Sequence, residues 1–160
     1  MKARVQRFPN GWVIRNNLLQ RDTNAKDRRS TAVHEAGHAV VAHLLGLKVH
    51  RLWLHETNQS VGRCEYRMPL KPCRFVRAAV SLAGHESEVA IYRRPITKLP
   101  AGDYAYAQRL GFSPRGIRFV AWAVRRIVRR HKRKIRGVAR VLLAKGELTR
   151  RQFLKAYREA

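Results

Sequence analysis

The feature that most constrains this fold is an apolar segment, residues 30–45, that also carries two histidines and a glutamate. Its apolar side chains would wrap most of the way round a helix, which is typical of a helix buried on several sides. Gly46 stands where a left-handed residue commonly ends a helix. Buried polar groups are costly unless they are paired or coordinated. His34, Glu35 and His38 therefore need a specific role in the interior.

These three residues form a His-Glu-x-x-His motif. Histidines four positions apart on a helix lie one turn above the other, so both imidazoles can reach one ion. If that ion is zinc, the pKa of a bound water falls towards about 7, and Glu35 can accept the proton as the water attacks a carbonyl. The motif predicts His34 and His38 as zinc ligands and Glu35 as the catalytic base. Histidines hydrogen-bonded within a core are the alternative.

A catalytic zinc site also needs a third protein ligand and an open fourth position. The candidates are His43, His50, His55, His85, Glu86, Glu88 and Asp103. His43 lies five residues beyond His38, which rotates it off the shared face. Histidines in the predicted strand are more often surface residues. The pattern alone leaves Glu88 and Asp103 as rivals.

Other patterns predict a mainly α-helical chain with one small β-hairpin or sheet. Residues 62–68 alternate apolar and polar, so they are expected to pair with residues 48–55. Further helices are expected over 73–92 and from residue 102 or 103. A long helix is expected from Ser113-Pro114 to Gly146, with a bend at Gly137. A last helix is expected from Thr149 to the C-terminus, and Thr149 would form a capping box with Gln152.

The first 26 residues are expected to form an arm, or a short strand and linker, ahead of one domain over 27–160. Within them, residues 9–11 read as a turn before a short strand, and residues 22–27 read as a linker. The sequence has no long apolar run that could span a membrane and no secretory signal pattern, which favours a soluble, cytoplasmic protein.

The charge balance is strongly basic, with 35 Lys and Arg against 10 Asp and Glu and a net charge of +25. The positive field of such a protein attracts polyanions. In other basic proteins the charge only increases solubility. The candidate polyanion-binding residues are Arg125, Arg126, Arg129, Arg130, Arg133 and Arg136. Aromatic residues are not expected on that helix face, so stacking of bases is not predicted. A solvated face or a docking patch for an acidic partner is the alternative.

The motif segments resemble the peptidase domain of the FtsH-type ATP-dependent zinc metalloproteases. Residues 30–42, Ser-Thr-Ala-Val-His-Glu-Ala-Gly-His-Ala-Val-Val-Ala, resemble the family's zinc helix, and residues 48–54 and Gly62 resemble the strands that follow. Residues 82–88, Leu-Ala-Gly-His-Glu-Ser-Glu, resemble its Gly-Gly-Arg-Ala-Ala-Glu helix. Residues 103–107, Asp-Tyr-Ala-Tyr-Ala, resemble its Asp-Leu-x-x-Ala segment, and residues 138–149 resemble its closing helix and turn.

The resemblance implies a zincin-like helical domain with Asp103 as the third zinc ligand and Glu88 as a residue that orients a ligand histidine. It implies a zinc endopeptidase. The sequence departs from the family in containing no ATPase module or phosphate-binding loop, and we expect cleavage of flexible or unfolded proteins. An exposed edge of the hairpin is expected to hold the peptide. Residues 96–102 depart from the family pattern. The alternatives are a nucleic-acid-binding module that retains a protease fold, and a protease recruited to DNA or RNA.

Overall fold

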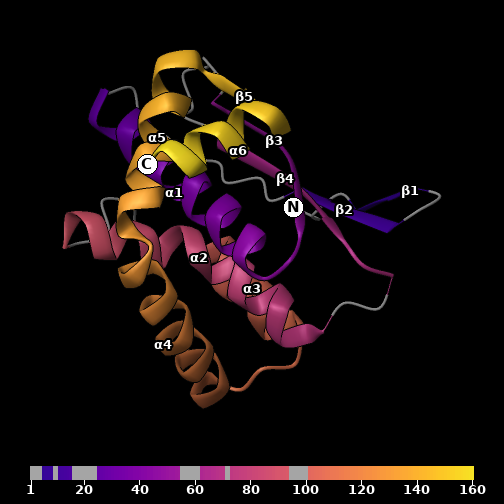
Figure 1. Cartoon of the computed structure of the whole chain (residues 1–160). Coiled ribbons are helices and arrows are strands. Elements are labelled where there is room, and N and C mark those ends of the chain that lie inside the picture. Colours follow the sequence, from indigo (N-terminus) through magenta and orange to yellow (C-terminus); the bar gives the residue numbers. More distant parts are fainter. Residues whose placement is uncertain (1–4, 9–10, 16–24, 55–61, 71–72, 94–100) are drawn as a thin grey trace.

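The computed structural model describes residues 5–8, 11–15, 25–54, 62–70, 73–93 and 101–160. Among these residues, helices predominate and a single sheet is present (Figure 1). The elements in chain order are β1 (Val5–Phe8), β2 (Gly11–Arg15), α1 (Ala25–Leu44), β3 (Lys48–Leu54), β4 (Gly62–Met68), α2 (Arg74–Tyr92), α3 (Ala101–Arg109), α4 (Pro114–Arg130), α5 (Lys132–Lys145), β5 (Glu147–Thr149) and α6 (Arg150–Glu159). The predicted mainly helical fold with a small sheet is confirmed at this level.

The sheet is antiparallel in the order β1-β2-β4-β3-β5, with a register irregularity in β3. The predicted β3–β4 hairpin is present, and Cys64, Tyr66 and Met68 of β4 are buried on one face as expected. The expectation of an exposed hairpin edge is wrong along much of its length. Strand β2 pairs with β4 over residues 65–68, and β5 pairs with β3 over residues 51–53.

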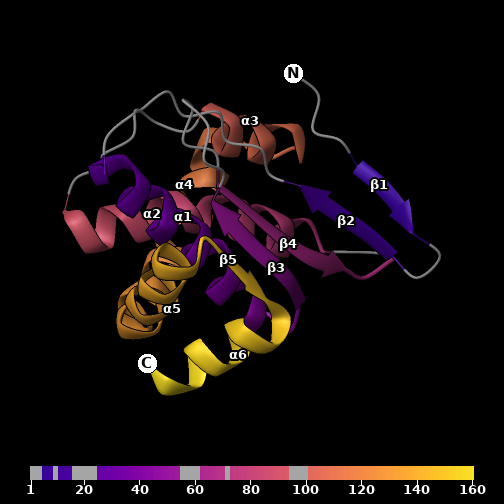
Figure 2. The same cartoon turned by 90° about the horizontal axis from the view of Figure 1, so that it is seen from above.

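Helix α1 is the central element of the fold. It packs against β3 and β4 and also contacts α2 and α5. Figure 2 shows the sheet extending away from these helices towards the β1–β2 hairpin. Small residues allow close crossing of α1 and α2, since a Cβ at Gly37 would overlap Ser87. Helix α1 is therefore enclosed on several sides, as its apolar circumference predicts.

Two boundaries differ from the sequence-based expectation. Helix α1 begins at Ala25, inside the expected linker and ahead of the expected domain boundary. The first residues of this helix include alanine, lysine and arginine, which have high helix propensity even where no apolar periodicity marks a helix. The long helix is interrupted at His131, not at Gly137. Gly137 instead lies against Ala160, where a Cβ would overlap the end of the chain. This glycine permits close packing of α5 against the C-terminus.

The predicted capping residues are confirmed. Ser113 Oγ accepts a hydrogen bond from the Gly116 backbone N–H at 3.1 Å, and Thr149 forms a capping box with Gln152. Gly46 and Gly146 have positive φ angles of 79° and 72°, as left-handed residues that end helices do. None of the helices in the described part of the chain is long and apolar enough to cross a membrane.

Candidate metal centre

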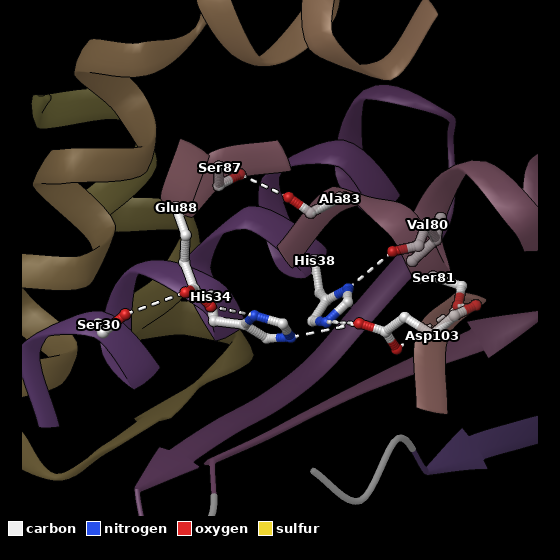
Figure 3. Close-up of polar contacts among 9 residues, drawn as sticks. All are labelled: Ser30, His34, His38, Val80, Ser81, Ala83, Ser87, Glu88 and Asp103. Carbon is white, nitrogen blue, oxygen red and sulfur yellow. Dashed lines mark hydrogen bonds and ion pairs between the residues drawn. The ribbon is translucent and has the colours of Figure 1, made fainter. Parts of the chain in front are cut away.

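Three buried side chains from two helices converge beside α2. His34 and His38 project from α1, and Asp103 projects from the first turn of α3 (Figure 3). Their exposed fractions are 1%, 0% and 3%. One ligand atom from each residue lies within 4.8 Å of the other two. The folded chain thus gathers two imidazoles and a carboxylate that are widely separated in sequence.

The distances fit a metal ion between these atoms. Asp103 Oδ2 lies 3.5 Å from His34 Nε2 and 3.9 Å from His38 Nε2. A tetrahedral zinc with bonds of about 2.0–2.1 Å separates its ligand atoms by roughly 3.3 Å. The observed distances are slightly longer than this value, so small side-chain adjustments would complete the geometry.

The same three atoms lack hydrogen-bond partners. His34 Nε2, His38 Nε2 and Asp103 Oδ2 are all buried without one. Buried polar atoms are nearly always hydrogen-bonded, and each exception calls for an explanation. A bound cation would satisfy all three together. This buried His/His/Asp group can therefore hold a metal ion.

The opposite nitrogens of both imidazoles have partners. His34 Nδ1 donates to Glu88 Oε1 at 2.5 Å, and Ser30 Oγ donates to Glu88 Oε2 at 3.1 Å. His38 Nδ1 donates to the Val80 carbonyl oxygen at 2.7 Å. These bonds direct both Nε2 atoms towards Asp103, in the manner of partners that orient metal-ligating histidines.

Asp103 is held in place by α2. Ser81 Oγ donates to the Asp103 carbonyl oxygen at 3.1 Å and lies 3.5 Å from Asp103 Oδ1. Ser81 is itself buried. Because Ser81 lies on the Oδ1 side of the carboxylate, Asp103 Oδ2 remains directed at the two histidines (Figure 3). The hydroxyl therefore sets the position of α3 as well as the direction of the carboxylate.

Glu35 lies next to this group without being one of the three converging residues. It is 1% exposed, and its Oε2 has no hydrogen-bond partner. A Cβ at Gly62 would overlap Glu35 and Thr31, so only a glycine lets the start of β4 lie against this carboxylate. Burial raises the pKa of Glu35 and, although the charge of His34 opposes it, the negative charges of Asp103 and Glu88 act in the same direction, so the pKa is about 8.

The two histidines titrate in opposite directions. Burial lowers the pKa of His34, but Asp103 and Glu88 outweigh it and raise the value to about 10. Burial and the charge of His34 lower the pKa of His38 to about 4. The carboxylates therefore create a negative potential that favours a cation at His34 Nε2, whether that cation is a proton or a metal.

The rival third ligands lie elsewhere. Glu88 contacts the far nitrogen of His34, and Glu86 forms an ion pair with Arg125 at 2.8 Å. His43 packs against Phe153 and Tyr157. His50 is partly buried on β3, and His85 packs against Tyr104. His55 lies outside the described residues.

Sequence reasoning missed two residues that shape the centre. A Cβ at Gly84 would overlap the His34 imidazole, so glycine is the residue that leaves room for this ring. Ser81 carries no recognisable motif, and its role follows only from the packing of α3 on α2. Gly84 lies within the segment that resembles the family's Gly-Gly helix, and that resemblance is the signal that identifies it.

The candidate polyanion-binding arginines separate into two groups. Arg125 forms an ion pair with the buried Glu86 and lies at the edge of the outer face of α4. The other five candidate arginines are exposed: Arg126, Arg129 and Arg130 on α4, and Arg133 and Arg136 on α5. The expectation that this face lacks aromatic residues is wrong, because Phe119 and Trp122 are 60% and 51% exposed there.

The sequence matches no protein-family model, and it matches no curated protein. The likeness to the FtsH-type peptidases therefore stays a prediction from the motifs quoted above.

Proposed function

We propose that this chain is a zinc-dependent endopeptidase of the FtsH-like type. The observation that carries the proposal is the set of buried atoms without hydrogen-bond partners: one from each of His34, His38 and Asp103, together with Oε2 of the adjacent Glu35. Three ligands and a separate carboxylate are what a catalytic zinc site requires. A purely structural histidine pair would not leave all four buried atoms without hydrogen bonds.

The donor set suits Zn²⁺, which is bound by imidazole nitrogens and carboxylate oxygens in hydrolytic sites. When bound, zinc activates a water for attack and polarises the carbonyl of the peptide. His34, His38 and Asp103 would hold the ion. Glu88 and the Val80 carbonyl would keep the two imidazoles oriented.

Glu35 is the residue proposed to move the proton. It precedes Ala36 in the motif and lies one position along the helix from His34, too close in sequence to share the ligand face. Its carboxylate would accept a proton from the attacking water and deliver it to the departing amine nitrogen. Burial keeps bulk water from competing for that proton.

The substrate proposed is an extended or unfolded polypeptide segment. Gly62 brings the backbone at the start of β4 against Glu35, so a chain lying along this end of the strand would pass the proton-transfer group. Main-chain hydrogen bonding to a strand accepts many sequences. A folded substrate would need to be opened first, because the ligand atoms are deeply buried.

The test compares Glu35→Gln with the wild type. Both proteins are loaded with one equivalent of zinc, and cleavage of an unfolded protein is followed by appearance of new amino termini. The variant is expected to bind zinc as the wild type does and to lose cleavage by at least about 100-fold, the lower range for acid–base catalysis. A zinc-loaded wild type that cleaves no unfolded protein would overturn the proposal.

A further inference from the structure

The outward face of α4 carries two stacked aromatic rings. The ring centroids of Phe119 and Trp122 lie 5.9 Å apart, and the ring planes are inclined by 26°. Large hydrophobic side chains are usually buried, and α4 already has a separate apolar face that packs in the core. The residues of that buried face are Ile117, Val120, Ala121, Val124 and Val128. The exposed rings are therefore additional to what folding requires.

Arginines surround these rings on the same helix face. The Arg126 guanidinium carbon lies 5.2 Å from the Trp122 ring centroid. The exposed arginines of α4 are Arg115, Arg118, Arg126, Arg129 and Arg130. Each lies four, seven or eight residues from Phe119 or Trp122, and these spacings place the arginines and the rings on one helix face. We call Phe119, Trp122 and these five arginines the α4 aromatic–arginine row.

The segment that contains α4 carries no acidic residue to offset this charge. No aspartate or glutamate occurs between Asp103 and Glu147. The buried Glu86 is the carboxylate that reaches α4 from α2, and it pairs with Arg125 outside the row. The row thus keeps its positive potential, to which a ligand with regularly spaced negative charges is complementary.

The aromatic surface also continues onto α2. Phe75 lies 6.5 Å from Phe119 between ring centroids, with the rings tilted by 57°. Close by in the chain, the Arg74 guanidinium lies over the Phe112 ring at 5.4 Å. Rings and guanidinium groups therefore lie close together at the start of α2, at Phe112 and around Phe119 and Trp122 of α4.

We propose that the α4 aromatic–arginine row binds single-stranded nucleic acid without sequence preference. Unpaired bases would stack on Trp122 and Phe119, while the arginines contact the phosphates. From Arg115 to Arg130 the helix extends about 22 Å, at 1.5 Å per residue, which is long enough for several nucleotides. This inference is independent of the metal centre.

Other occupants fit the row less well. A duplex keeps its bases stacked inside and would contact the arginines alone. An amphipathic helix binds a membrane by burying its apolar face, but that face of α4 is already in the core. A second copy of the chain would bring another net charge of +25 against the row. An unpaired strand uses both the rings and the charges.

The test measures binding of a fluorescent oligothymidylate and of a duplex of equal length by anisotropy. Trp122→Ala is expected to weaken oligothymidylate binding roughly 10-fold and to leave duplex binding nearly unchanged, because stacking on one ring is lost. Leu70→Ala, at another exposed apolar residue with 72% exposure, is the control and should change neither. Trp122→Phe keeps a ring and should retain most of the affinity, which shows that any loss in the alanine variant comes from stacking.

A second comparison separates the row from overall charge. One double variant carries Arg115→Ala and Arg126→Ala in the row, and its control carries Arg151→Ala and Arg158→Ala, which removes equal charge from α6. The first is expected to lower both the affinity for the oligonucleotide and its salt dependence more than the control does. Equal losses from the two pairs would overturn the proposal. So would wild-type oligothymidylate affinity in Trp122→Ala. So would a tryptophan fluorescence change that the wild type shows and Trp122→Ala lacks, if anionic phosphatidylserine vesicles cause it and the oligonucleotide does not.

Discussion

Glu88 accepts a hydrogen bond from His34 Nδ1 at 2.5 Å, which fixes the imidazole so that its other nitrogen faces Asp103. Ser30 holds the second oxygen of the same carboxylate. Both residues of the pair are almost completely buried. The contact links α1 to α2 and makes the direction of a candidate ligand depend on a residue that would not touch the metal.

Glu88→Gln is therefore expected to weaken zinc binding about 10- to 100-fold, as loss of a ligand's orienting partner typically does. The amide is similar in size but lacks the charge that favours a cation at His34. Competition with a chromophoric chelator measures the affinity. Glu159→Gln makes the same chemical change at an exposed position of α6 and should leave zinc binding unaltered. Equal affinities in all three proteins would contradict the assigned role of Glu88.

Gly84→Ala is expected to disturb the same imidazole by contact, because the added methyl would overlap the His34 ring. Overpacking of this kind costs about 1–3 kcal/mol of unfolding free energy and would displace Nε2 from its neighbours. Zinc titration and thermal unfolding report the two effects. Gly116→Ala, also within a helix, adds its methyl beside Phe112 and should preserve zinc binding. Undiminished zinc affinity in Gly84→Ala would show that the ring has room to move.

Arg125→Ala is expected to destabilise the fold by leaving Glu86 buried without its partner. The guanidinium side chain is 43% exposed, which reduces the loss, so about 2 kcal/mol is expected. For a chain of this size that corresponds to a fall of roughly 4–8 °C in Tm. Arg118→Ala removes an exposed arginine from the same helix and should change stability by less than about 0.5 kcal/mol. Indistinguishable melting of the two variants would contradict this account of the Arg125–Glu86 pair.

Local rules predicted much of the fold. The apolar circumference of residues 30–45, the alternation of residues 62–68 and the cap at Ser113 each depend on neighbours in sequence, and each corresponds to an element that the structure contains. Strand β5 was not predicted, because three residues carry too little periodicity to signal a strand. The sheet order also depends on contacts between distant segments.

The candidate site was predictable only in part. His34 and His38 share a helix face by spacing, but Glu88 and Asp103 lie on other helices, so spacing does not decide between them. The packing of α3 on α2 through Ser81 places Asp103 beside both Nε2 atoms. The aromatic residues of the arginine-bearing face were not predicted, because aromatic side chains are usually buried, whereas the buried face of α4 is filled by smaller side chains.

Crystallography of the zinc-loaded protein, with anomalous scattering recorded at the zinc edge, tests the central claim most directly. We predict one strong peak within about 2.0–2.2 Å of His34 Nε2, His38 Nε2 and Asp103 Oδ2, with the remaining position free of protein ligands. A peak located elsewhere, an Asp103 carboxylate turned away from the zinc, or Glu35 bound as a fourth protein ligand would contradict the account.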